Sequence, residues 1–258
     1  MNNQNLDVKN KNRIHLLDFL RGTAIFVMIV THLIFDIAYL FDSKWAQVSF
    51  DFIEKYASIF SAIFVGVSGV CAALGRDPAK RGATVFLYGC LVTVVTAVFM
   101  PDIIILNDVL ILLGFCMLTY SVTEKFLKKI PKIAGIILFL FLFVISWNVG
   151  EGYFGIEGLF KIQINPYFYE VDWLYPLGIH SDKFMSGNYY PIFPWIFLFM
   201  ACSYIGRHIK EKGAPDFAKV NFCPPINFLG RHSLIIYLLH QPIFFGILWV
   251  IGETVLRG

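Results

Sequence analysis

Apolar residues follow one another in seven long stretches, and polar residues gather between them. The stretches cover residues 16–40, 52–75, 83–100, 103–123, 132–149, 191–208 and 232–251. An α-helix needs about 20 apolar residues to cross the roughly 30 Å hydrocarbon core of a bilayer. The pattern therefore predicts an all-α, polytopic transmembrane helix bundle of about seven spans over 16–251, with a leader over 1–15 and a tail over 252–258.

Positive charge alternates from one connection to the next. Lysine and arginine are concentrated before the first stretch and after the second, fourth and sixth, whereas the other connections are neutral to acidic. Cytoplasmic loops of membrane proteins carry an excess of Lys and Arg. The alternation predicts an inside N-terminus and an outside C-terminus. The first stretch is too long for the core of a cleavable signal peptide, so we expect it to stay as a helix.

The composition excludes several other classes of protein. The chain is 57% hydrophobic and 15% charged, with a mean hydropathy of +0.67, whereas a soluble domain has roughly 25% charged residues. A net charge of +3 gives no indication of nucleic-acid binding. Four of the five cysteines lie inside apolar runs and none forms a Cys-x-x-Cys pair, so neither a disulfide framework nor a metal site is indicated.

The longest connection, 149–190, is predicted to lie outside and is rich in aromatic residues, Gly and Pro. Two interpretations stay open for it: an aromatic girdle at the lipid headgroups, or a re-entrant lid. The chain has no visible internal repeat, so it lacks the inverted-repeat pattern of many secondary transporters. The aromatic residues concerned are Tyr153, Phe154, Phe160, Tyr167, Phe168, Tyr169, Trp173 and Tyr175.

The first apolar stretch carries four ionisable side chains on one side of its predicted helix. At about 100° per residue, Asp18, Arg21, His32 and Asp36 fall within roughly 60° of one another. Ionisable groups inside a membrane span are expensive and mark functional sites by default. We expect Asp18 to hold Arg21 near the cytoplasmic interface, although Arg21 alone would also suit a snorkelling side chain. The stripe predicts a wet passage along this helix.

His32 and Asp36 form the deeper pair of this stripe. Their i, i+4 spacing lets the carboxylate orient the imidazole and raise its basicity. A histidine held in this way is a candidate general base for an acceptor hydroxyl or amine. The alternative is a buried histidine that only hydrogen-bonds to a neighbouring helix. The other ionisable groups on the same side favour the functional interpretation.

The last apolar stretch supplies a second polar face. Ser233, Tyr237 and His240 follow helical spacing, and Gln241 precedes Pro242, where a helix can be broken and its carbonyls freed. No carboxylate lies one turn from His240, so the catalytic and structural interpretations of that residue are evenly balanced. We expect Tyr237 and His240 to face His32 across a cavity.

Basic residues also gather at the predicted cytoplasmic helix ends. The positive-inside rule explains most of them, but a few would suit the phosphates of an anionic cofactor. The best placed are Arg21, Arg231 and His232, beside Ser233. Arg76 and Arg207 complete the set of candidate cofactor-binding residues.

Four sequence blocks resemble a known family. LLDFLRGTAIFVMIVTHLIFD (16–36) resembles the opening helix of small bacterial relatives of heparan-α-glucosaminide N-acetyltransferase, and its Arg and His, with ten residues between them, resemble a signature of the acyltransferase-3 family. FVGVSGV (64–70), YYPIFPW (189–195) and GRHSLIIYLLHQPI (230–243) resemble later helices of the same relatives, in the same order.

The resemblance implies acetyl or acyl transfer across a bacterial cell (inner) membrane. Acetyl-CoA would bind from the cytoplasm without a metal, and a sugar or glycan precursor would enter from outside. His32 would be the general base or the acetyl carrier, with Asp36, Arg21 and Asp18 as catalytic partners. The expected partners also include membrane lipids and a second copy of the chain. The expected acceptor-binding residues are His240, Gln241, Tyr237, Asn188 and Trp195.

Two other functions compete with acetyl transfer. In a small proton-coupled transporter or a lipid-linked glycan flippase, His32 and Asp36 would relay protons, and substrate would move without acyl-CoA. In an accessory subunit the site would be degenerate. The presence or absence of acetyl-CoA binding separates these hypotheses.

Overall fold

The computed structural model describes residues 13–256, which form two compact units. Unit one contains the described residues up to Phe64 and those from Ala214 onward, and unit two is Val65–Gly213. Each unit is described by itself.

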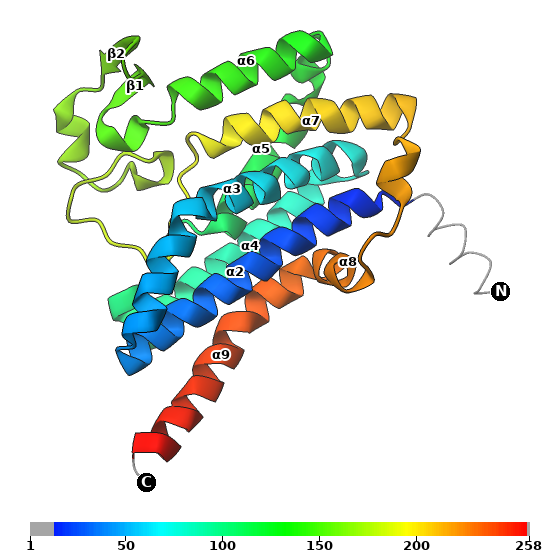
Figure 1. Cartoon of the computed structure of the whole chain (residues 1–258). Coiled ribbons are helices and arrows are strands. Elements are labelled where there is room, and N and C mark those ends of the chain that lie inside the picture. Colours follow the sequence, from blue (N-terminus) through cyan, green and yellow to red (C-terminus); the bar gives the residue numbers. More distant parts are fainter. Residues whose placement is uncertain (1–12, 257–258) are drawn as a thin grey trace. The chain divides into compact units, whose positions relative to one another are not determined.

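Unit one combines an N-terminal and a C-terminal segment of the described residues. Helix α2 (His15–Phe41) ends where Asp42 adopts a left-handed conformation, and α3 (Lys44–Leu74) begins at once and continues into unit two. From the C-terminal part come η5 (Asp216–Lys219), α8 (Pro224–Arg231) and α9 (Ser233–Leu256). Helix α2 packs against both α8 and α9, so sequence segments about 200 residues apart lie side by side (Figure 1).

Glycines allow α2 and α8 to approach until their backbones touch. A Cβ atom on Gly22 would lie 1.9 Å from the carbonyl oxygen of Ile226, and one on Gly230 would lie 1.9 Å from that of Asp18. Small residues are the usual means of close helix contact in membranes. This crossing fixes α8 against the first turns of α2.

Unit two is built from helix pairs and a long loop. Its helices are the end of α3, α4 (Pro78–Phe99), η1 (Pro101–Ile103), α5 (Val109–Leu127), α6 (Lys132–Ile145) and α7 (Trp195–Lys212). Helix α4 pairs with α5, and α6 pairs with α7. Gly114 lies against the backbone of Phe86, and Gly135 lies against the Tyr204 ring, so both pairs use glycine for close approach.

Outward side chains on unit two are apolar, as lipid contact requires. On α4, Leu87 is 68% exposed and Phe99 is 77% exposed, and on α6 Ile133 is 75% exposed. A soluble protein rarely shows so much exposed apolar surface. This surface agrees with the prediction of an integral membrane protein.

All seven predicted segments contain a helix, and five helices are long and apolar enough to span a membrane: His15–Ala38, Lys44–Leu74, Pro78–Phe99, Val109–Leu127 and Lys132–Glu151. Helix α7 does not meet that criterion among the described residues, and α9 contributes a shorter apolar stretch, Ser233–Leu248. The predicted all-α class is therefore confirmed to the extent that the described residues are mostly helical. The seven spans and the orientation of the ends stay predictions.

Several helix bounds differ from those predicted. Helix α5 starts at Val109 because Asp108 accepts a hydrogen bond from the Ile111 N–H and caps it. Helix α9 continues to Leu256 through most of the predicted tail. The leader up to residue 12, and residues 257–258, lie outside the described residues.

The connection 149–190 is folded but mostly not helical. It contains η2 (Val149–Glu151), an antiparallel hairpin of β1 (Tyr153–Ile156) and β2 (Phe160–Gln163), η3 (Pro166–Tyr169) and η4 (Tyr175–Leu177). Tyr175, His180, Phe184 and Tyr189 pack ring against ring. These contacts give the loop its own small aromatic core.

Two hydrogen bonds, one of them from a buried tyrosine, further stabilise the loop. The Ser181 N–H donates to the Asp172 carboxylate and lowers the pKa of that group. Burial raises the pKa of the Tyr189 hydroxyl, which donates to the Tyr175 carbonyl. Both the girdle and the lid interpretation stay open for this loop.

Candidate functional site

Two histidines from opposite ends of the chain meet between α2 and α9. Nδ1 of His32 lies 2.9 Å from Nε2 of His240. The ring planes are within 20° of each other and the ring centroids are 5.0 Å apart. His240 is buried at 7% exposure, and His32 is half-buried. From the sequence, these two side chains are expected to face each other across a cavity, whereas in unit one their rings are in direct hydrogen-bond contact.

The second nitrogen of His240 is also engaged. Its Nδ1 lies 2.6 Å from the backbone carbonyl oxygen of Tyr237, one turn earlier in α9. The rings of Tyr237 and Phe244 stand beside the imidazole, with centroids 5.6 Å and 6.1 Å away. The His240 ring is thus held by a hydrogen bond at each nitrogen and by aromatic walls.

The structure gives His32 a hydrogen-bond partner other than Asp36, and the orienting role of Asp36 stays a prediction. The i, i+4 spacing does put both groups on one side of α2, but Nδ1 of His32 is taken by His240. Asp36 is buried at 9% exposure, and the side chain of Gln241 lies beside it. Among the described residues, Oδ2 of Asp36 and Oε1 of Gln241 have no hydrogen-bond partner.

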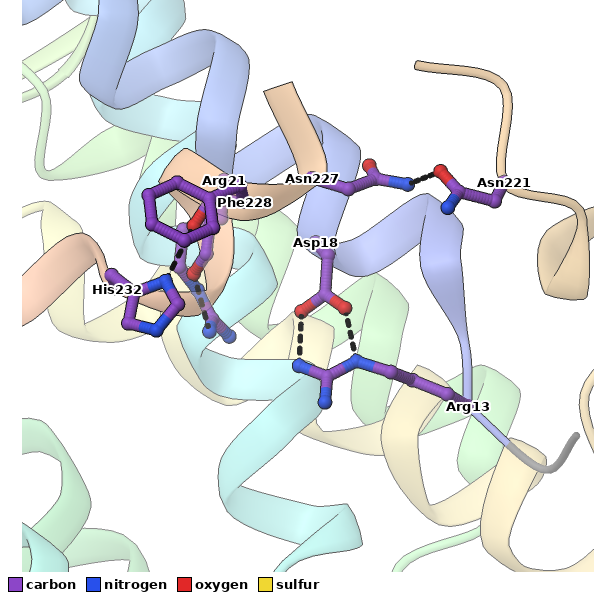
Figure 2. Close-up of polar contacts among 8 residues, drawn as sticks. Arg13, Asp18, Arg21, Asn221, Asn227, Phe228 and His232 are labelled. Carbon is purple, nitrogen blue, oxygen red and sulfur yellow. Dashed lines mark hydrogen bonds and ion pairs between the residues drawn. The ribbon is translucent and has the colours of Figure 1, made fainter. Parts of the chain in front are cut away.

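At the start of α2, the expected ion pair has a different cation. Arg13 donates to both carboxylate oxygens of Asp18, with Nε–Oδ2 and Nη2–Oδ1 distances of 2.5 and 3.2 Å (Figure 2). The expected pair of Asp18 with Arg21 does not form. Arg13 precedes α2 and reaches back to the helix, whereas Arg21 extends to α8, with Nη1 3.5 Å from the Gly230 carbonyl oxygen.

The candidate cofactor-binding residues of unit one gather where α8 meets α9. Arg231 and His232 are exposed, and Ser233 begins α9. Nδ1 of His232 lies 3.0 Å from the Phe228 carbonyl oxygen, and its ring packs on Phe228 (Figure 2). With the Arg21 contact to Gly230, this junction brings three cationic or protonatable side chains to one place.

Two asparagines, one in α8 and one just before it, were not among the candidates named from the sequence. Asn227 of α8 is fully buried, and its Nδ2 donates to Oδ1 of Asn221 over 2.5 Å. Oδ1 of Asn227 has no partner among the described residues. Helix α8 has only eight residues, begins with two prolines and is too short and too polar to appear as an apolar stretch, so its buried Asn had no clear signal.

The other four candidates belong to unit two. Arg76 is exposed in the turn after α3, and Asn188 is half-buried near the end of the long loop. Trp195 is buried, with its ring against Phe143, Trp147 and Tyr190. Its surroundings are those of a packing residue.

Arg207 makes packing contacts within unit two. It is 9% exposed, Nη1 donates to the Leu127 carbonyl at the end of α5 over 2.8 Å, and its guanidinium lies over the Tyr204 ring. These contacts satisfy the buried charge without a cofactor. The described residues contain no group of three His, Cys, Asp or Glu side chains that could hold a metal ion.

Comparison with known families identifies the chain. The family model described as heparan-alpha-glucosaminide N-acetyltransferase, catalytic, matches residues 13–242. No curated protein and no solved structure matches the chain. The match includes α2, α8 and the part of α9 that carries His240. The chain therefore belongs to the heparan-alpha-glucosaminide N-acetyltransferase catalytic family.

Proposed function

We propose that this protein is a membrane acetyltransferase that moves the acetyl group of cytoplasmic acetyl-CoA to a hydroxyl or amine of an extracytoplasmic sugar or glycan. The family match supports the reaction type. The observation that carries the assignment of the site is the contact between Nδ1 of His32 and Nε2 of His240, within two apolar helices. A hydrogen-bonded pair of imidazoles inside apolar helices suits proton transfer.

The chemical step balances with His32 as a general base. The imidazole takes the proton of the acceptor O–H or N–H while the acceptor atom attacks the thioester carbonyl carbon. The carbon–sulfur bond breaks, and the CoA thiolate leaves and takes the proton from the imidazolium. A route in which His32 itself carries the acetyl group forms and breaks the same overall bonds. Both routes require an unprotonated nitrogen on His32.

Arg21, Arg231, His232 and Ser233 form the proposed donor end. Guanidinium groups bind phosphates through charge-assisted hydrogen bonds, and two of these residues are exposed at the α8–α9 junction. Arg21 and His32 are 11 residues apart on α2, a rise of roughly 16 Å. An extended pantetheine arm would follow this rise from the phosphates to the thioester. Arg76 is a further candidate, whereas the contacts of Arg207 support a packing role.

Asp36 and Gln241 form the proposed acceptor end. Each has a buried oxygen without a hydrogen-bond partner among the described residues. A buried acceptor left without a donor costs about 1–3 kcal/mol, and the O–H and N–H groups of a sugar would supply such donors. Asn188, Trp195 and Tyr237 stay predicted acceptor-binding residues.

We expect Asp36→Asn to weaken acceptor use without weakening donor binding. The neutral amide offers one acceptor oxygen and loses the charge, so kcat/KM for the acceptor should fall by about 10-fold or more. Steady-state kinetics with the acceptor varied at saturating acetyl-CoA measures this. Asp51→Asn, an exposed carboxylate on α3 in unit one, is the matched control. An unchanged acceptor KM and kcat in Asp36→Asn would remove this residue from the site.

Ligand binding tests the proposal against the transport hypothesis. Purified protein in detergent should melt at a higher temperature with acetyl-CoA or CoA, since a ligand that binds only the folded state stabilises it. A panel of amino sugars and neutral sugars, analysed by mass spectrometry, then identifies the acceptor class. An unchanged melting temperature, together with substrate flux in liposomes without acetyl-CoA, would support a transporter or flippase and refute the proposal.

A further inference from the structure

A backbone carbonyl and two imidazoles form a continuous hydrogen-bonded chain in unit one. The Tyr237 carbonyl oxygen contacts Nδ1 of His240 over 2.6 Å, and Nε2 of His240 contacts Nδ1 of His32 over 2.9 Å. The carbonyl of Ile236 is a second backbone acceptor near His240. Each contact joins a known pair of atoms, so the positions of the protons can be deduced.

The deduction starts from the carbonyl, because a carbonyl oxygen only accepts hydrogen bonds. Nδ1 of His240 must therefore carry a proton. A neutral imidazole has one N–H, so Nε2 of His240 has a lone pair and accepts. Nδ1 of His32 must then be the donor. In the neutral pair, Nε2 of His32 is left unprotonated.

We propose that His240 is a positioning residue that holds His32 in the Nδ1–H tautomer and so makes Nε2 of His32 the atom that reacts. This inference rests on the proposed acetyl transfer and adds a role to it. A free imidazole prefers the opposite tautomer, with the proton on Nε2. Without His240, the reactive lone pair of His32 would therefore sit on the wrong nitrogen for most of the time.

The hydrogen-bonded chain of Tyr237, His240 and His32 also stabilises the positive charge that forms during acetyl transfer. When Nε2 of His32 takes the acceptor proton, the Nδ1 proton can shift to Nε2 of His240, and the positive charge is shared by two rings. The Tyr237 carbonyl faces the Nδ1–H of His240 and favours that charge, as the third member of a catalytic triad does for its histidine. Two other polar side chains lie next to the histidines in sequence: Asp36, one turn after His32 on α2, and Gln241, directly after His240 on α9, and these two side chains contact each other.

The geometry gives His240 little freedom to adopt another arrangement. Its ring is 7% exposed and stands between the rings of Tyr237 and Phe244. A flip of the ring would place a carbon atom against the Tyr237 carbonyl and lose both hydrogen bonds. The tautomer of His32 is thus set by a backbone atom of a different helix.

The test is nitrogen NMR of protein labelled with ¹⁵N-histidine, which distinguishes protonated from unprotonated ring nitrogens. In the wild type we expect the resonances of His32, assigned by their loss in His32→Gln, to show Nδ1 protonated and Nε2 unprotonated. In His240→Leu we expect His32 to change to the Nε2–H form. His180→Leu, in the long loop of unit two, is the control and should leave the His32 resonances unchanged.

Kinetics supply the second readout. His240→Leu should lower kcat for acetyl transfer by about 10²-fold or more, because the tautomer is wrong, while the KM for acetyl-CoA stays unchanged. His240→Gln keeps a side-chain oxygen that can accept from Nδ1–H of His32 and should restore part of the activity. A purely structural role would lower the melting temperature in both variants without changing the tautomer.

The outcomes separate this inference from the function on which it rests. A wild-type spectrum with His32 in the Nε2–H form, or a His240→Leu spectrum unchanged from the wild type, overturns the positioning role even if acetyl transfer is observed. Absence of acetyl transfer in the wild type, with the expected spectra, overturns the proposed function instead. The expected spectra together with the selective loss of kcat support both.

Discussion

His32→Ala lowers the rate of acetyl transfer by about 10²–10⁴-fold, the usual contribution of a general base, and leaves acetyl-CoA binding largely intact. The reason is that His32 provides the lone pair for the acceptor proton, whereas the proposed phosphate contacts lie at the α8–α9 junction. Turnover is measured as the release of free thiol from acetyl-CoA. Binding is measured as the rise in melting temperature that CoA causes.

Thr31→Ala is the matched control for this variant. Thr31 precedes His32 on α2, and its hydroxyl donates only to the Val27 carbonyl of its own helix. We expect its turnover to stay within a few-fold of the wild type. Turnover retained in His32→Ala, with Thr31→Ala unaffected, would show that this imidazole is neither the base nor the acetyl carrier.

Gly22→Ala should have the largest effect on the fold. The added Cβ would lie 1.9 Å from the Ile226 carbonyl oxygen, so the α2 and α8 backbones must move apart. Overpacking of this kind costs about 1–3 kcal/mol and sometimes more, and here the neighbour is backbone that cannot rotate away. We expect a clear fall in melting temperature, together with weaker CoA binding, because Arg21 would lose its contact with the Gly230 carbonyl.

Gly246→Ala provides the control for that substitution. It lies on α9 of the same unit, and a Cβ at this position meets no atom within 4 Å. Alanine also has the higher helix propensity, so stability should be unchanged or slightly higher. Gly22→Ala with the melting temperature of Gly246→Ala and normal CoA binding would contradict the close α2–α8 crossing.

The helices and the polar stripe of α2 could be predicted from the sequence because both follow local rules. Long apolar runs require helices in a membrane, and helical periodicity puts His32 and Asp36 on one side of α2. The four blocks that led to the family also lie within or beside single helices. Each of these inferences needs only residues that are close in the sequence.

The partners within the site could not be predicted in the same way. His32 and His240 are 208 residues apart, and the sequence offers several other polar residues that could have faced His32. Asp36 was the nearest partner by spacing, but a neighbouring helix supplied a better-placed nitrogen. Arg13 took the place of Arg21 for a similar reason, since the carbonyl at the end of α8 competes for Arg21.

Helix α8 and the internal structure of the long loop could not be predicted for a different physical reason. Helix α8 has only eight residues and is held by the glycine contacts with α2, which are tertiary. The loop 149–190 is stabilised by ring packing among residues such as Tyr175 and Tyr189 and by a short hairpin. Neither feature produces a long apolar stretch, and both depend on contacts between residues that are far apart in the sequence or packed only in the folded loop.

The most direct test of the central claim counts products. Purified wild-type protein is incubated with acetyl-CoA and an acceptor sugar, and free thiol and acetylated acceptor are measured in the same sample. The proposed function predicts one acetylated acceptor for each thiol released, with both falling together in His32→Ala. Thiol release without acetylated acceptor, or the same yield of both products in His32→Ala, would contradict it.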